Sequence, residues 1–386
     1  LDLWKQTREH IGPELPRAIR CAGYDYDLVD DDALPTLPPD TAPVVVLPRV
    51  RTLPPATRAW LDAVRAAGGT VLAVDSPGYP DGVTVTAAGF AEALARALPP
   101  DTALTGANDE IGVVHRRLTD GDVYFVANTG SSVRTFELAP RTRRAGFERW
   151  DPATGAVETL AGAHTVTLTL QPYQATVVVA TDRPDAPDCP IVPDREQVLE
   201  LTGPWRFGYA DADPAAGSTR EVALPHRWED DRPGWSGAAT YRLELTADPA
   251  WLAPDARVTL DFGPCQPTAD ADQEAVARGN SYRVAVAPPV REVAVVAVNG
   301  EPCGVVWDAP YRIDLTGRFR AGGNTLSITV HNTGAAAVAT DPDAAGVVAE
   351  SRRLYGTRFH QQDLELALDG VSSGLLGVPT LRCTGG

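Results

Sequence analysis

The sequence contains no methionine, and it begins with Leu1 instead of an initiator residue. We therefore expect these 386 residues to be a piece of a longer chain, whose targeting signal would lie upstream. Long apolar runs are also missing. None approaches the roughly 20 residues that a membrane-spanning helix needs, so no membrane partner is expected.

Cysteine is scarce and widely spaced, without a C-x-x-C pair, at Cys21, Cys189, Cys265, Cys303 and Cys383. This pattern indicates neither a zinc site nor a dense disulfide framework. One bridge among the last four cysteines stays open if the parent protein is secreted. We leave the compartment undecided and favour a secreted or periplasmic location. No cofactor is predicted for this chain.

Basic residues are outnumbered, with 34 Lys and Arg against 51 Asp and Glu, a net charge of −17. This charge repels phosphate backbones and argues against a nucleic-acid partner. A neutral ligand such as a carbohydrate fits the charge, although the charge does not require one.

The first part of the chain has the pattern of an α/β domain, which we place at residues 1–105. Short apolar runs bounded by proline or glycine predict strands that are buried on both faces, and apolar stripes at helical spacing predict the helices between them. A strand, a helix and a strand at this spacing form a βαβ unit with a parallel sheet. The predicted helices are 13–22, 55–67 and 90–98, and the predicted strands are 24–29, 44–47 and 70–74.

The rest of the chain alternates apolar and polar residues and predicts β-structure. Residues 106–182 hold six short strands, at 113–118, 122–128, 133–138, 147–150, 164–170 and 175–180, which indicates a small antiparallel β-sandwich. A linker rich in Pro and Asp follows, and limited proteolysis is expected to cut first at 181–193. Residues 194–386 form the last domain, with strands predicted at 205–209, 239–245, 258–262, 293–298, 305–307, 311–315 and 325–331.

Four stretches of the last domain resemble the galactose-binding-like jelly roll of many glycosidases. They are Val295–Gly300 with the hairpin pair Asn299-Gly300, Gly304–Trp307, Pro310–Thr316 and Gly323–Leu326. Leu201–Trp205 and Ser236–Tyr241 resemble the opening strands of the same module. The first domain, with Tyr26–Val29 and Gly68-Gly69, looks like a glutamine-amidotransferase-like, flavodoxin-like domain. This order of domains is similar to the C-terminal half of glycoside hydrolase family 106, the α-L-rhamnosidases. One departure is an insertion at about 264–289.

The resemblance implies inverting hydrolysis of α-L-rhamnosides in plant or microbial polysaccharides, by two carboxylates in a (β/α)₈ barrel. That barrel is expected upstream of Leu1 as a partner within the same polypeptide, and the calcium of the family would be bound there. No residue of this chain matches the family's catalytic positions, so no catalytic residue is assigned. We expect this chain alone to be inactive.

Three candidate sites remain. The α/β domain lacks a cysteine on a turn after a strand, so an amidotransferase activity is not expected. Asp270, Asp272 and Glu274 alternate and could offer oxygen ligands to calcium, but the spacing of an EF-hand is missing. Trp228 and Trp235 flank a loop rich in Asp, Pro and Gly, and they are the candidates for stacking against a sugar.

Other tryptophans and the N-terminus have competing interpretations. Trp205 and Trp307 lie inside predicted strands, so we assign them to the core. The apolar residues of the first helix, together with Trp4, are expected to dock against the upstream domain, unless the terminus is simply frayed. The alternative function is a non-catalytic carbohydrate-binding or adhesion protein that uses the α/β domain as a spacer.

Overall fold

A computed structural model describes residues 10–12, 14–107, 110–152, 155–162, 164–182, 196–210, 219–268, 284, 286–356 and 372–385. They fall into two compact units, Leu1–Cys189 and Pro190–Gly386. No helix in these ranges is long and apolar enough to cross a membrane. Trp4, most of the predicted linker, and the trio Asp270, Asp272 and Glu274 lie outside the described residues.

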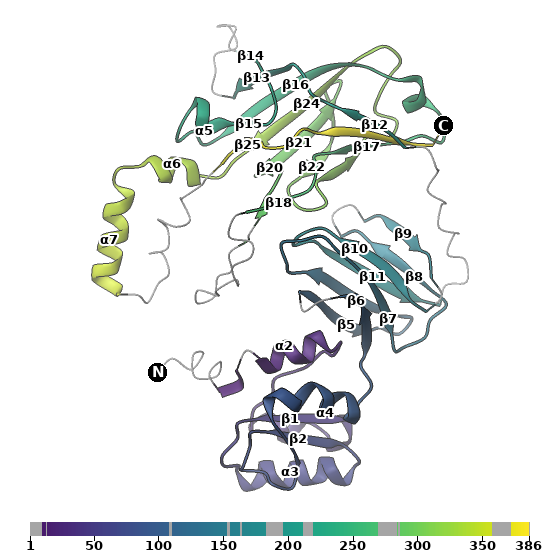
Figure 1. The fold of residues 1–386 in the computed structure, drawn as a ribbon, viewed down its shortest axis with the longest axis vertical. Helices are drawn as coiled ribbons and strands as arrows, with labels where there is room; N and C mark the ends of the chain where they lie inside the picture. Colours follow the sequence, from purple (N-terminus) through teal and green to yellow (C-terminus); the bar gives the residue numbers. More distant parts are fainter. Residues whose placement is uncertain are drawn as a thin grey trace. The chain divides into compact units, whose positions relative to one another are not determined.

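The first unit opens with a three-layered α/β part (Figure 1). Its parallel sheet has the order β1-β2-β3, with β1 at Val44–Pro48, β2 at Thr70–Val74 and β3 at Val83–Val85. Helices α2 (Glu14–Cys21) and α4 (Phe90–Ala97) pack on one face, and α3 (Pro55–Ala66) packs on the other. Short 3-10 turns lie at Leu34–Thr36, Pro39–Thr41 and Ala87–Gly89. The parallel sheet is therefore covered on both faces, as its apolar strands require.

Two expectations for this part are corrected. The strand predicted at 24–29 is wrong, because this segment is an irregular connection in which Leu28 and Val29 are exposed. The first helix has its partners inside the unit, because Leu15 and Ile19 are buried against α4 and β2. Its apolar face therefore needs no upstream domain.

The rest of the first unit is a β-sandwich of two antiparallel sheets (Figure 1). One has the order β10-β7-β4 and the other β5-β6-β11-β8-β9. The strands are β4 Thr102–Thr105, β5 Ile111–Arg117, β6 Gly121–Asn128, β7 Arg134–Pro140, β8 Gly146–Trp150, β9 Val157–Leu160, β10 Val166–Leu170 and β11 Ala175–Thr181. Side chains from both sheets, among them Tyr124, Phe136 and Leu168, form one buried core. The six strands predicted for 106–182 are confirmed, while β9 was not predicted, nor was β4, which lies within the predicted α/β domain but pairs with β7.

The second unit is built from antiparallel sheets (Figure 1). The largest has the order β14-β13-β16-β24-β21-β22, and a second has the order β12-β26-β17-β23. Small sheets β15-β25-β20 and β18-β19 complete it. Its strands are β12 Glu196–Glu200, β13 Trp205–Tyr209, β14 Arg220–Val222, β15 His226–Arg227, β16 Ala238–Thr246, β17 Arg257–Asp261, β18 Gln266–Pro267, β19 Val286–Ala287, β20 Val290–Arg291, β21 Val293–Val298, β22 Glu301–Val306, β23 Arg312–Asp314, β24 Gly323–His331, β25 Gly374–Leu375 and β26 Thr380–Thr384.

The centre of the largest sheet explains why these strands pair as they do. Phe207, Tyr241, Ile328 and Val296 lie opposite one another on β13, β16, β24 and β21, and all four are buried. Short helices α5 (Trp228–Asp231), α6 (Ala335–Thr340) and α7 (Ala344–Tyr355) lie in the connections, with a 3-10 turn at Pro249–Leu252. Cys265, Cys303 and Cys383 are free, so the bridge left open among the last four cysteines is not formed.

Candidate functional site

Trp228 begins α5, and its side chain is fully buried. Its Nε1 donates to the Tyr241 hydroxyl at 2.8 Å. A Cβ atom on Gly374 would lie 3.0 Å from the same Nε1, so the backbone of β25 closes over the indole. Trp228 is therefore a core residue, and no face of its ring is open to a sugar. This corrects its expected position at a loop surface.

Trp235 is only partly buried, and its ring is already in contact with other side chains. The Arg232 guanidinium carbon lies 4.0 Å from the ring centroid, and Tyr209 meets the ring edge-on at 5.4 Å. The backbone carbonyl of Trp235 accepts from Asn332 Nδ2 at 2.8 Å, which holds the loop in place. Sugar binding by Trp235 stays a prediction.

A series of hydrogen bonds connects Trp228 to an acid. The Tyr241 hydroxyl lies 2.8 Å from His226 Nδ1, and His226 Nε2 lies 2.6 Å from Asp231 Oδ2. Burial, with the nearby Arg220 guanidinium, lowers the pKa of His226 to about 4. Arg220 also pairs with Asp231. In the neutral imidazole, Nε2–H donates to Asp231 and Nδ1 accepts from Tyr241. This series of hydrogen bonds holds α5 in place, and none of its side chains is arranged as a nucleophile.

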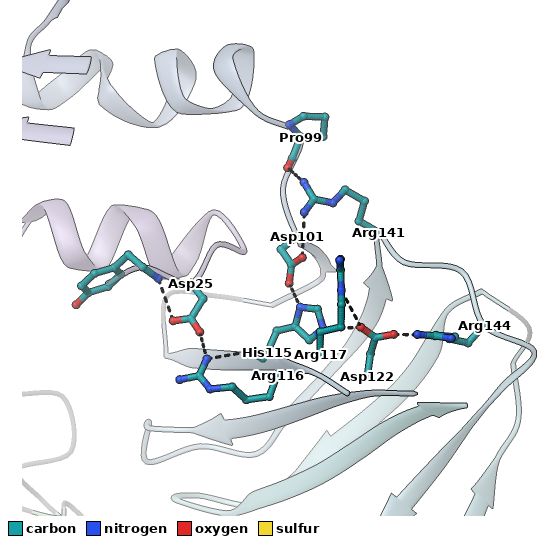
Figure 2. Close-up of polar contacts among 10 residues, drawn as sticks. Asp25, Pro99, Asp101, His115, Arg116, Arg117, Asp122, Arg141 and Arg144 are labelled. Atoms are coloured by element: carbon teal, nitrogen blue, oxygen red, sulfur yellow. Dashed lines mark hydrogen bonds and ion pairs between the residues drawn. The ribbon is translucent and has the colours of Figure 1, made fainter. Parts of the chain in front are cut away.

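A second cluster lies in the first unit, where the α/β part meets the sandwich (Figure 2). His115 on β5 bridges two carboxylates: its Nδ1 lies 2.7 Å from Asp101 Oδ2 and its Nε2 lies 2.9 Å from Asp122 Oδ1. Asp101 directly precedes β4, and Asp122 lies on β6. The ring of Tyr124 stacks on the imidazole at 4.5 Å. We call Asp101, His115 and Asp122 the bridged triad.

Arginines surround the bridged triad and balance its charge (Figure 2). Arg144 Nε contacts Asp122 Oδ2 at 2.8 Å, and Arg141 reaches Asp101 at 3.3 Å and the carbonyl of Pro99 at 3.0 Å. The hydrogen bond from His115 holds the pKa of Asp101 below its usual range, and the Asp101 carboxylate raises the pKa of His115. A protonated His115 donates from both ring nitrogens, which matches its two acceptors.

In both clusters the titratable side chains bond to one another. No group of three or more His, Cys, Asp or Glu side chains within the described ranges could hold a metal ion. Sequence reasoning missed the bridged triad because Asp101 precedes β4 while His115 and Asp122 lie on β5 and β6, and the three residues form no recognisable motif. The signal that could have found it is an isolated Asp122 in an otherwise apolar strand, since a buried carboxylate needs a partner.

Trp307 was assigned to the core, and this is wrong, because 61% of its surface is exposed. It directly follows the last residue of β22, which lies at the edge of the largest sheet. Trp205, by contrast, is fully buried as expected.

Comparison with known proteins relates both units to a glycosidase. A solved rhamnosidase from Novosphingobium sp. PP1Y matches 88% of this chain at 21% identity, with a TM-score of 0.59. The match covers 33% of that protein, so the chain spans about a third of its length. At this identity the likeness shows the fold alone: a small parallel α/β sheet followed by antiparallel sheets, as in part of that rhamnosidase.

Other similar structures match more weakly and carry no argument here. The FMN-binding beta-glucuronidase from Facaelibacterium prausnitzii L2-6 is 17% identical over 49% of this chain and 22% of its own, with a TM-score of 0.28. The Bifidobacterium dentium beta-glucuronidase is 18% identical over 50% of this chain and 31% of its own, with a TM-score of 0.30. No curated protein matches the chain.

The family comparison falls on the first unit. Residues 68–164, from the turn before β2 to the connection between β9 and β10, match the family model described as alpha-L-rhamnosidase. The bridged triad lies inside this matched region. The chain therefore contains a region of glycoside hydrolase family 106, the alpha-L-rhamnosidases.

Proposed function

We propose that this chain is the accessory, non-catalytic C-terminal region of a glycoside hydrolase that acts on α-L-rhamnosides in plant or microbial polysaccharides. The observation that carries the proposal is the family match at residues 68–164, within a chain whose fold follows one third of a rhamnosidase. In this proposal the catalytic barrel lies upstream. The three parts are an amidotransferase-like α/β domain, a small sandwich and a galactose-binding-like jelly roll.

The side-chain geometry favours a structural, non-catalytic role for these residues. His226 and Asp231 are committed to holding α5, and the bridged triad is committed to the junction in the first unit. A general acid or base exchanges a proton with the substrate. The side chains of both clusters already use their hydrogen-bonding atoms to bind one another.

Hydrolysis of an aryl α-L-rhamnoside tests the proposal. We expect the polypeptide encoded by the complete reading frame to release the aryl alcohol, and the 386-residue chain to match a heat-killed control. Turnover by the chain alone would show that it is catalytic. An inactive complete polypeptide, tested on rhamnosides of several linkages, would contradict the assigned substrate class.

A second candidate function is carbohydrate binding by the last domain, and the exposure of Trp307 favours it. An exposed indole face is a recurrent platform for the apolar face of a sugar ring. Affinity electrophoresis of the chain in gels with rhamnose-containing polysaccharide would detect binding as retardation. If Trp307 is the platform, Trp307→Ala abolishes the retardation while Trp150→Ala retains it. Equal retardation of both variants would exclude Trp307.

A further inference from the structure

The five-stranded sheet of the first unit has an unusual outer face. One residue from each strand lies in a single row across this face, each directly opposite the next, in the order Val114, Phe125, Val177, Trp150 and Val157. Neighbouring strands are about 4.8 Å apart, so the row is about 19 Å long. We call these five residues the apolar row.

The apolar row is open to solvent. Val177 is partly buried, and the other four side chains are between 36% and 55% exposed. An antiparallel sheet with one solvated face normally carries polar residues there. The row breaks this rule at every strand of the sheet, and Phe125 and Trp150 give it a large apolar area.

The other sheet of the same sandwich follows the rule. On its paired strands β7 and β10, the outward side chains include Thr135, Glu137, Thr167 and Thr169, and all four are exposed. Thr135 and Thr169 even bond to each other at 2.9 Å through their hydroxyl groups. The apolar row is therefore a property of one face and not of the sandwich as a whole. Contiguous apolar surface rimmed by polar residues marks an interaction site.

We infer that the apolar row is the surface on which the catalytic domain of the longer polypeptide packs. This inference rests on the proposed function. The chain spans about a third of the rhamnosidase whose fold it follows, so a protein of that length has ample chain outside these residues to cover the face. Packing between domains of one chain commonly buries roughly 600–1,500 Å², which a row of this length with its neighbours can supply.

Two other occupants fit less well. A second copy of the chain would bring two molecules with a net charge of −17 each into contact, and their repulsion opposes association. A sugar needs polar partners beside the stacking surface. The one polar group in the row side chains is the Trp150 indole N–H, and it already donates to Glu148 Oε2 at 2.8 Å.

Cysteine labelling tests the inference. In a background with Cys21, Cys189 and Cys303 replaced by serine, Phe125→Cys reports on the apolar row and Thr167→Cys on the polar face of the same sandwich. Both positions are exposed on strands, which makes them a matched pair. Each variant is made in the 386-residue chain and in the polypeptide of the complete reading frame, and the rate of maleimide labelling is measured. Val114→Cys provides a second reporter on the row.

We expect Phe125→Cys and Val114→Cys to react at least ten times more slowly in the complete polypeptide than in the chain, with Thr167→Cys unchanged. Equal rates in both proteins, equal protection of both faces, or protection that develops in the chain itself as its concentration rises would each overturn the inference. Protection of the row in a complete polypeptide that hydrolyses no rhamnoside would refute the proposed activity and leave the docking surface standing.

Discussion

The carboxylate of Asp122 is fully buried, and its surroundings explain how the fold tolerates it. His115 and Arg144 contact one oxygen each, at 2.9 Å and 2.8 Å. Arg144 also reaches Asp182 at 2.6 Å, at the end of β11. The buried charge therefore ties together strands that are distant in sequence, and its cost is offset only while its partners stay in place.

Replacing Asp122 by asparagine should destabilise the first unit strongly. Removing one partner of a buried pair leaves the other charges uncompensated, and such changes commonly cost about 3–5 kcal/mol. The measurement is the free energy of unfolding in urea. Glu158→Gln is the control, because its pair with Arg149 is exposed and worth about 1 kcal/mol or less. Equal effects of both variants would show that burial does not govern the network.

The bridged triad should also make the junction sensitive to pH. The pKa of His115 is raised, so its contribution to stability is complete below the unfolded value of about 6.5 and is lost as the pH rises through the folded value. The pKa of Asp101 is lowered, so its contribution is present above about 4 and is lost as the pH falls through the folded value.

Amide hydrogen exchange of β5 and β6, corrected for the intrinsic pH dependence, should therefore show the greatest protection between about pH 4 and pH 6.5. In the His115→Gln variant, the protection of β5 and β6 should fall less as the pH rises above about 6.5, because glutamine does not titrate. An unchanged profile in the variant would assign the pH dependence to other groups.

Two tryptophans show which features of the structure the sequence could not predict. Trp228 and Trp307 have the same local signature, an aromatic residue beside a short strand, yet one is fully buried and the other is exposed. The difference comes from β25, whose residues lie about 145 positions beyond Trp228 in the sequence and cover it. Local pattern carries no information about such a distant contact.

Among the elements, the β21–β22 hairpin is the best understood. Asn299 and Gly300 both have positive φ, 53° and 84°, as the two-residue turn requires. Asn299 Nδ2 donates to Asn324 Oδ1 at 2.8 Å, and the Asn324 amide donates to the carbonyls of Arg320 and Gly322. Asn324 is buried with its polar groups bonded, so the resemblance at Asn299-Gly300 and Gly323–Leu326 has a physical basis.

Gly300→Val should destabilise the second unit by about 1–2 kcal/mol, the cost of holding an L-residue in the left-handed region. The check is the urea midpoint of the transition. Gly323→Ala is a suitable control, since Gly323 starts β24 and an added Cβ there would meet no atom within 4 Å. A Gly300→Val protein as stable as the control protein would mean that the turn rearranges without cost.

Strong local signals account for the elements that were predicted correctly. The apolar runs of β1 and β2 and the apolar stripe of α3 leave little choice of structure. The three residues of β3, one of which is an exposed valine, are too few to give a period, so this strand was missed. The segment 24–29 has strand-like composition but no strand beside it to pair with. Tertiary pairing decides such segments.

For the whole molecule, the apolar row predicts how the chain behaves in isolation. We expect the 386-residue chain to bind a fluorescent dye for apolar surfaces, and Phe125→Thr with Val157→Thr to reduce that fluorescence several-fold. Threonine retains β propensity, so the strands should persist. Val305→Thr, at an equally exposed position in the second unit, is the control. A chain that binds no dye would show that its apolar surface is too small or too dispersed to matter.

The order of folds along the chain was predictable because composition and period change with each part. How the parts meet was not predictable, since it depends on contacts such as Arg116 Nη1 to Asp25 Oδ2 at 2.8 Å, between residues 91 positions apart (Figure 2). Charged residues on a strand and a loop carry no sign of such a pairing in the sequence.

The pairing of β4 with β7 has a consequence for exchanging segments between related proteins. β4 is the first strand of the sandwich along the chain, and it follows α4 after only four residues. A graft that joined one protein's α/β part to another's sandwich at residue 105 would give the recipient a foreign edge strand, and would separate Asp101 from the His115 it evolved with. A crossover before Pro99 keeps β4 and the bridged triad together, so exchanges between related proteins should be tolerated better upstream of that proline than at residue 105.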